Sequence, residues 1–235
     1  MDKTEQIDYV LTEFNSAGII INREQAEKYV ILCNYMLNYN NKVNLTAITD
    51  FREVVMKHFI DSVLPFSKME IKNNSSIIDV GTGAGFPSLP LLIYRPDLKA
   101  TLCDSLAKRC TYLELVCKEI GVSAEIVHSR AEELGQKRRE CYDYSTARAV
   151  AALPVLTEFC LPFVKVGGHF VALKSVNESA DSSQHAVSVL GGSIEEITDY
   201  DLPNGDKRRL IMIKKVMQTP TKYPRSYSNI TKKPL

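Results

Sequence analysis

The feature that most constrains this chain is an alternation of short apolar strands with helices, which begins after the polar run at 73–76. The pattern predicts strands over 77–80, 99–103, 124–128, 142–147 and 169–173, with helices over 106–120 and about 153–164 between them. Such alternation builds a parallel sheet covered by helices on both faces. Two further segments, 193–198 and 209–214, flank the short turn Pro203-Asn204-Gly205, which predicts an antiparallel pair at one edge of the sheet.

The first 66 residues carry a helical pattern instead. The first predicted helix ends near Gly18, and its apolar residues recur at the spacing of one helix face; they are Ile7, Val10, Leu11 and Phe14. Two more helices are expected from Asn22 and from near Asp50 to about residue 65, each with Gln or Glu in the capping-box position. We therefore expect a helical cap over 1–70, an α/β domain over 71–216, and a basic tail over 217–235 that belongs to the same compact unit.

The strongest local motif is a glycine loop between the first predicted strand and the helix that follows. It contains Gly81, Gly83 and Gly85 in the spacing G-x-G-x-G, in the strand-to-helix context that a nucleotide-binding loop needs. Glycine lets the backbone turn tightly and lets a ligand approach it closely. The spacing differs from the G-x-G-x-x-G of dinucleotide enzymes, and Phe86 would crowd a pyrophosphate. No Walker lysine follows, which argues against nucleoside triphosphate hydrolysis.

An acidic residue follows the second predicted strand. Asp104, with Ser105 beside it, lies where a carboxylate can accept both ribose hydroxyls of an adenosine-containing cofactor. Together with the G-x-G-x-G loop it favours S-adenosyl-L-methionine, and the alternative is a helix-capping Asp in an ordinary turn. After the third predicted strand, a backbone N–H near Ala131 and the carboxylate of Glu132 are candidates for reading the adenine edge. The alternative for Glu132 is an exposed charge at a helix start.

Two basic residues stand at the carboxyl ends of later strands, where open α/β sheets bind ligands. Arg148 follows the fourth predicted strand and Lys174 the fifth. Methyl transfer needs chiefly a well-placed acceptor, and guanine N7 needs no base, since it carries no proton. N7 and O6 are acceptors that an Arg or Lys recognises, so both residues are catalytic candidates. The alternative is that each pairs with an acid of the fold. The chain has no Pro-Cys and no Pro-Pro, which argues against attack at cytosine C5 and at exocyclic amines.

The net charge of +1 hides an asymmetry. From residue 204 onward there are nine basic residues and one acidic residue, or +8, which leaves 20 basic and 27 acidic residues, or −7, in the rest of the chain. A basic tail on an acidic body is expected for binding to a phosphate backbone. The alternative is a solvated, solubilising tail. The candidate RNA contacts are Lys222, Arg225, Lys232 and Lys233.

Composition excludes several other classes of protein. The six cysteines include no C-x-x-C pair and the four histidines no H-x-x-x-H pair, so we predict no metal site. No apolar run approaches the roughly 18 residues of a membrane-spanning helix, and the first residues show no secretory signal. We expect a cytoplasmic protein without membrane contact, and nothing in the sequence demands more than a monomer.

Taken together, these motifs resemble the glucose-inhibited division protein B family, the 16S ribosomal RNA guanine-N7 methyltransferases. The matching stretches are 44–48, 58–62, 79–87, 104–109, 130–132, 147–151, 167–168 and 222–225. The chain departs from the family pattern at Ser88 and Ser175, where Gly is usual, and in its last residues, which lack a Gly and a second Pro.

The resemblance implies a class I, Rossmann-like S-adenosylmethionine-dependent methyltransferase sheet, parallel with one antiparallel edge strand, plus an N-terminal helical cap. It also implies that the cofactor meets Gly81, Phe86, Ala131, Glu132 and Arg148. The implied substrate is one guanine of 16S rRNA in the small ribosomal subunit, near the decoding region.

Two other functions remain open from the sequence. One is a nicotinamide-dependent oxidoreductase on the same type of sheet, against which Phe86 and the loop spacing argue. The other is a non-catalytic RNA-binding assembly factor. Within the cap, Asn44, His58 and Asp61 are expected either to face the substrate cleft or to form a buried polar network that fixes the cap to the sheet.

Overall fold

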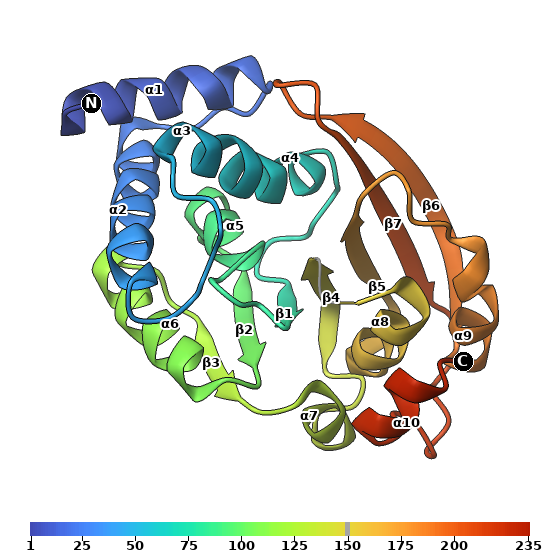
Figure 1. Ribbon diagram of the computed structural model, residues 1–235. Coiled ribbons are helices and arrows are strands. Elements are labelled where there is room, and N and C mark those ends of the chain that lie inside the picture. The colour runs from blue at the N-terminus through green and yellow to red at the C-terminus, as the bar shows by residue number, and fades with distance from the viewer. Residues whose placement is uncertain (149–150) are drawn as a thin grey trace.

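A seven-stranded sheet forms the centre of the protein in the computed structural model, which describes residues 1–148 and 151–235 (Figure 1). The strand order is β3-β2-β1-β4-β5-β7-β6. The strands are β1 (Ser76–Val80), β2 (Lys99–Asp104), β3 (Glu125–His128), β4 (Tyr142–Arg148), β5 (Val164–Lys174), β6 (Gly192–Asp201) and β7 (Lys207–Lys215). The first five strands are parallel, and β7 runs antiparallel to both of its neighbours. The predicted mostly parallel sheet with antiparallel pairing at one side is confirmed, with β7 inserted between β5 and the outermost strand β6.

Helices cover both faces of the sheet, as the alternation predicts (Figure 1). One face carries α1 (Lys3–Ser16), α2 (Arg23–Asn40), α3 (Phe51–Val54), the π-helical stretch η1 (Val55–Ile60), α4 (Asp61–Ser67), α5 (Ser88–Tyr94) and α6 (Ala107–Ile120). The other face carries α7 (Ala131–Lys137), α8 (Leu153–Cys160), the 3-10 turns η2 (Leu161–Phe163) and η3 (Asp181–Ser183), α9 (Gln184–Val189) and α10 (Tyr227–Lys232).

The central strands are apolar on both sides because each contributes to two hydrophobic cores. In β1, Ile77 belongs to the core under the N-terminal helices, and Ile78 to the core under α8. In β5, Val171 faces the first core while Phe170 and Ala172 face the second. Successive residues of a strand point to opposite faces, so a strand covered on both sides reads as a continuous apolar run.

The predicted helix starts in the cap are confirmed by their hydrogen bonds. The side chain of Asn22 accepts from the backbone N–H of Gln25, and the side chain of Gln25 accepts from the backbone N–H of Asn22. Asp50 caps α3 by accepting from the N–H of Glu53 at 3.0 Å. The expected single helix to about residue 65 is interrupted by the π-helical stretch η1 between α3 and α4. Such wide turns occur frequently at functional sites.

The segment after β4 also differs from its prediction. Helix α8 ends at Cys160 instead of near residue 164, because Pro162 lacks the N–H that would continue the helix. Strand β5 therefore begins at Val164 and includes Gly168. A Cβ at Gly168 would lie 2.4 Å from the carbonyl oxygen of Asp143, so only glycine fits at this point of the strand pair.

Candidate active site

The glycine loop after β1 is held in shape by a carboxylate from the neighbouring strand. The N–H of Gly83 donates to Oδ2 of Asp104 at 2.9 Å, and Gly83 has a positive φ of 61° that favours glycine. Gly85 has a φ of 93°, and a Cβ there would lie 2.3 Å from Leu89 Cδ1. The absence of a side chain at Gly85 thus serves the packing of α5 against the loop.

Asp104 stands at the carboxyl end of β2 and is almost completely buried. Its Oδ1 accepts from the N–H of Leu106 at 2.9 Å, and the guanidinium of Arg109 lies 3.5 Å from Oδ2. The carboxylate is therefore oriented before any ligand binds. These bonds join the loop after β1 to the loop after β2, and they place Asp104 beside a cavity.

That cavity, of about 100 Å³, brings together five of the predicted cofactor residues: Gly81, Asp104, Ser105, Ala131 and Glu132. Hereafter it is called the nucleoside cavity. It lies at the carboxyl ends of β1, β2 and β3, where open α/β sheets bind ligands. Glu132 is buried at the start of α7, so the alternative of an exposed helix-start charge is wrong.

The same cavity is also lined by Arg130, from the matching stretch 130–132, and by two residues that sequence reasoning missed, Phe159 and Tyr227. Phe159 comes from α8 and Tyr227 from α10, at the far end of the chain. Their rings are nearly parallel, at 15°, with centroids 6.1 Å apart, and the Arg130 guanidinium lies 4.8 Å from the Tyr227 ring. No local pattern reveals these contacts, because they depend on where the tail folds back onto the sheet.

Phe86 lies at the other end of the glycine loop and packs against the cap. Its ring stacks on the imidazole of His58 with centroids 4.6 Å apart, and the guanidinium of Arg148 lies 4.9 Å from its centre. The loop, the cap and the end of β4 therefore meet at this buried ring. Asn44, by contrast, is exposed, and Thr46 binds the histidine instead, with its Oγ1 2.8 Å from Nε2 of His58.

Arg148 is the centre of a network that joins three parts of the fold. Its Nη1 lies 3.5 Å from Asp61 at the start of α4, and 3.4 Å from the carbonyl oxygen of Lys57 in η1. Nε of Arg208 on β7 donates to both carboxylate oxygens of Asp61, at 3.1 and 3.2 Å. His58 and Asp61 thus form the polar network that fixes the cap to the sheet.

The same residues also line a second cavity of about 400 Å³, here called the basic cavity. It contains both predicted catalytic residues, Arg148 and Lys174, at the carboxyl ends of β4 and β5. Nζ of Lys174 donates to the carbonyl oxygen of Ala151 and lies 3.4 Å from Glu178. Both cations therefore have partners in the fold and also face a cavity. Ala149 and Val150 of the matching motif lie outside the described residues.

Two buried ionisable groups at the site have strongly shifted pKa values. Burial and the neighbouring Arg148 lower the pKa of His58 to about 3, so its imidazole is neutral. Beneath the glycine loop, burial raises the pKa of Asp79 to about 7, although Thr82 Oγ1 donates to its carboxylate at 2.7 Å. Ser88, at the departure from the family pattern, donates its N–H to Asp79 at 3.3 Å.

Most of the positive charge that the sequence places after residue 204 is paired with acids of the fold, and five of the six paired residues belong to β7. Six of the nine basic residues after position 204 pair with acids: Lys207–Asp201, Arg208–Asp61, Arg209–Asp199, Lys214–Glu195, Lys215–Glu140 and Arg225–Glu158. The ion pairs of the described residues do not include Lys222, Lys232 or Lys233. Of the predicted RNA contacts, Arg225 therefore has a structural partner, and the three lysines remain available.

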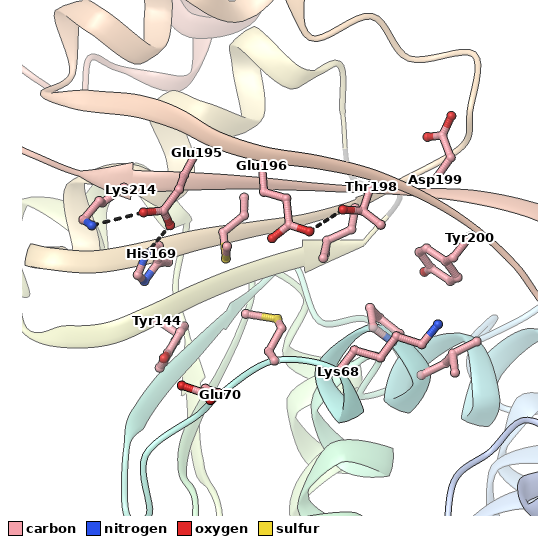
Figure 2. A pocket seen from close by; sticks show the side chains of 15 residues that line it. Lys68, Glu70, Tyr144, His169, Glu195, Glu196, Thr198, Asp199, Tyr200 and Lys214 are labelled. Carbon is pink, nitrogen blue, oxygen red and sulfur yellow. Dashed lines mark hydrogen bonds and ion pairs between the residues drawn. The ribbon is translucent and has the colours of Figure 1, made fainter.

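The larger cavity shown in Figure 2 lies between α4 and strands β5, β6 and β7 and has a volume of about 450 Å³. None of the predicted site residues is among those that line it. Several of its polar side chains bind one another: Lys214 and His169 both contact Glu195, at 3.1 and 2.8 Å, and Glu196 accepts from the hydroxyl of Thr198. Because none of the predicted site residues lies here, the two smaller cavities are the candidate site.

The sequence predicts neither a metal site nor a membrane-spanning helix, and the described residues bear on both predictions. Among residues 1–148 and 151–235 there is no group of three or more His, Cys, Asp or Glu side chains placed to hold a metal ion. No helix in the same ranges has the length and apolar character needed to cross a membrane.

The fold itself is that seen in class I methyltransferases. A precorrin-6y C5,15-methyltransferase from Geobacter metallireducens superposes with a TM-score of 0.52 at 11% identity, covering 66% of this chain and 87% of that structure. A 16S rRNA adenine-N1 methyltransferase from Catenulisporales acidiphilia gives a TM-score of 0.53 at 13% identity, covering 66% and 88%.

The particular family follows from sequence similarity. The family model of GidB, rRNA small subunit methyltransferase G, matches residues 23–210, and the chain belongs to this family. Proteins named ribosomal RNA small subunit methyltransferase G are 48% identical in Acetivibrio thermocellus, over 93% of this chain and 92% of that protein, and 42% identical in Clostridium botulinum, over 97% and 98%. The protein is therefore a methyltransferase, and the oxidoreductase alternative is wrong.

Proposed function

We propose that this enzyme transfers a methyl group from S-adenosyl-L-methionine to N7 of one guanine in 16S rRNA of the small ribosomal subunit. The observation that carries the proposal is the placement of two cavities along the carboxyl ends of one sheet. The nucleoside cavity holds the acids suited to an adenosine, and the basic cavity holds the cations suited to a guanine. The first cavity lies at the ends of β1, β2 and β3 and is closed by Phe159 and Tyr227. The second lies at the ends of β4 and β5 and is closed by residues of the cap and by Arg208 of β7.

The residues of the nucleoside cavity fit an adenosine-containing methyl donor. When bound, S-adenosylmethionine supplies an electrophilic methyl group on a sulfonium. Asp104, already oriented by two backbone N–H groups, accepts the ribose hydroxyls, and Ala131 and Glu132 contact the base. Gly81 and Gly83 leave the backbone of the loop accessible to the rest of the donor, and Gly85 lets α5 pack against that loop. Phe86 and Arg148 close the site on the side of the cap.

The basic cavity suits an acceptor that presents hydrogen-bond acceptors and needs no deprotonation. Guanine N7 and O6 are such a pair, and Arg or Lys is their usual partner. Arg148 and Lys174 orient the guanine there, and the network through Asp61 and Arg208 holds Arg148 in place. Positioning of this kind supplies a large part of the rate in a direct displacement.

The exposed lysines of the tail, Lys222, Lys232 and Lys233, contact RNA phosphates in this proposal, while Arg225 anchors the segment that carries them. The helices of the cap over 1–70 serve to shape the basic cavity through His58 and Asp61. The enzyme acts on ribosomal subunits in the cytoplasm, as a monomer.

The experiment that tests the proposal is transfer of labelled methyl from S-adenosylmethionine to 30S subunits and to naked 16S rRNA that lack the modification, followed by nucleoside analysis. We expect the label in 7-methylguanosine. Label in another nucleoside would overturn the acceptor atom. Cofactor binding without transfer to either substrate would favour the non-catalytic assembly factor.

A further inference from the structure

The tail residue Tyr227 has an unusual environment for a large aromatic side chain. It is 49% exposed, yet it lines the nucleoside cavity together with Asp104 and Glu132. Exposed aromatic groups beside a cavity frequently mark a contact surface for a ligand. The ring contributes little to the hydrophobic core. Its neighbours are the ring of Phe159 and the exposed guanidinium of Arg130.

Two contacts with consecutive residues of α8 determine the position of Tyr227. Arg225 binds the fully buried carboxylate of Glu158 through Nε at 2.9 Å and Nη2 at 2.6 Å, and its backbone N–H donates to the same group at 2.9 Å. Two residues further on, Tyr227 packs against Phe159. The buried side chain of Ile230 then holds the other end of α10 in the core. The ring is thus positioned by an anchored segment (α10 beside α8 in Figure 1).

The nucleoside cavity is small for its proposed ligand. Its volume of about 100 Å³ is below the roughly 300–1,000 Å³ of typical small-molecule sites.

The contact between Arg130 and Tyr227 is an exposed cation–π pair, which is weak in water. A purine that enters beside Asp104 gains more by stacking on the aromatic ring, because base–aromatic contacts are stronger than exposed cation–π contacts.

We propose that Tyr227 is a binding residue that stacks against the adenine of the methyl donor, so that docking of the C-terminal tail sets the affinity for the cofactor. This inference rests on the function proposed above. It assigns the last helix of the described chain to the cofactor site and places the tail lysine Lys232 on the same short helix as the stacking ring. Arg130 moves from the face of the ring when the base binds.

The test is the dissociation constant for S-adenosylmethionine and for adenosine, measured by calorimetry on the full chain. Tyr227→Ala is expected to weaken both by the same factor, about 5- to 100-fold, because the stacking partner that the variant removes faces the base. Tyr227→Phe keeps the ring and is expected to retain wild-type affinity. Tyr227→Leu keeps an apolar contact to Phe159 and is expected to bind more weakly while retaining the melting temperature. Ser228→Ala, exposed on the same helix, is the matched control.

Wild-type affinity in both the Ala and the Leu variants would overturn the assignment. A loss of affinity for S-adenosylmethionine with unchanged affinity for adenosine would also overturn it, because Tyr227 would then not touch the base. Failure of the wild-type protein itself to bind S-adenosylmethionine would instead refute the proposed function, so the two failures are distinguishable.

Discussion

Arg148 Nη2 lies 3.2 Å from Nδ1 of His58, and this contact determines which nitrogen of the imidazole carries the proton. A guanidinium has only donors, so Nδ1 must be the acceptor and therefore unprotonated. The proton is then on Nε2, which donates to Thr46 Oγ1 at 2.8 Å. The neutral histidine orients Arg148 over the ring of Phe86, and a second proton on His58 would break the contact that holds the arginine.

His58 should lower the stability of the folded protein in mild acid, whereas the raised pKa of Asp79 acts in the opposite direction. The folded-state pKa of His58 is lowered from 6.5 to about 3, so below pH 6.5 the unfolded chain binds a proton that the folded chain does not. This group therefore removes up to about 1.4 kcal/mol of stability for each pH unit between 6.5 and 3. Urea unfolding of the wild type and of His58→Gln at pH 7 and pH 5 should show a smaller acid loss in the variant. His185→Gln, at an exposed histidine, is the control, and equal losses in wild type and His58→Gln would contradict the prediction.

Replacement of Asp104 should abolish cofactor binding. Asp104→Ala removes the proposed ribose acceptor and also leaves the N–H groups of Gly83 and Leu106 without their partner. We expect a loss of affinity for S-adenosylmethionine of at least about 100-fold, since hydrogen bonds to charged groups contribute roughly 1.5–3 kcal/mol each. Asp104→Asn keeps one acceptor oxygen and should lose less. Calorimetric titration of both variants measures the effect, and unchanged affinity in Asp104→Ala would remove this residue from the site.

Loss of the Arg225–Glu158 pair should lower the free energy of unfolding. Glu158 is fully buried, and Arg225→Ala leaves its charge without the guanidinium. Breaking a buried pair by removing one partner costs about 3–5 kcal/mol. We expect a loss of that order in the free energy of unfolding, together with faster proteolysis of the tail. Lys222→Ala, three residues away and exposed, should leave both unchanged. A stability equal to wild type in Arg225→Ala would show that the tail does not depend on this pair.

Replacing the three lysines outside the ion pairs should weaken RNA binding without changing the stability of the fold. Replacing Lys222, Lys232 and Lys233 with Ala removes up to three positive charges that can bind phosphates. The slope of log affinity against log salt should then fall by about 1 for each phosphate that is no longer bound. Filter binding to 16S rRNA at several salt concentrations measures the slope, and the melting temperature serves as the control. A triple variant with the wild-type slope would exclude these lysines from the RNA interface.

Features that depend on neighbouring residues could be predicted from the sequence. The helix caps at Asn22 and Asp50, the strand-helix alternation and the glycine loop each involve groups only a few positions apart. The nucleoside cavity could be predicted in part for a similar reason. Parallel strands end at the same edge of a sheet, so the residues after β1, β2 and β3 necessarily meet there.

The missed features are those that depend on contacts between distant parts of the chain. Asp61 binds Arg208, which is 147 positions away, and no local pattern pairs those two residues. The positive charge after residue 204 could be counted, but its pairing with acids such as Asp61 and Glu158 could not. Tyr227 lines the nucleoside cavity because α10 packs on α8.

The strand order also has a consequence for synthesis of the protein. Strand β6 precedes β7 in the chain, yet β7 lies between β6 and the rest of the sheet. Until β7 has been made, β6 therefore has no partner within the sheet, and an unpaired strand is prone to aggregation. Four carboxylates in β6 oppose this hazard, because repeated negative charge disfavours pairing between copies of the same segment. They are Glu195, Glu196, Asp199 and Asp201. In the folded protein three of these carboxylates, Glu195, Asp199 and Asp201, instead pair with Lys214, Arg209 and Lys207 of β7.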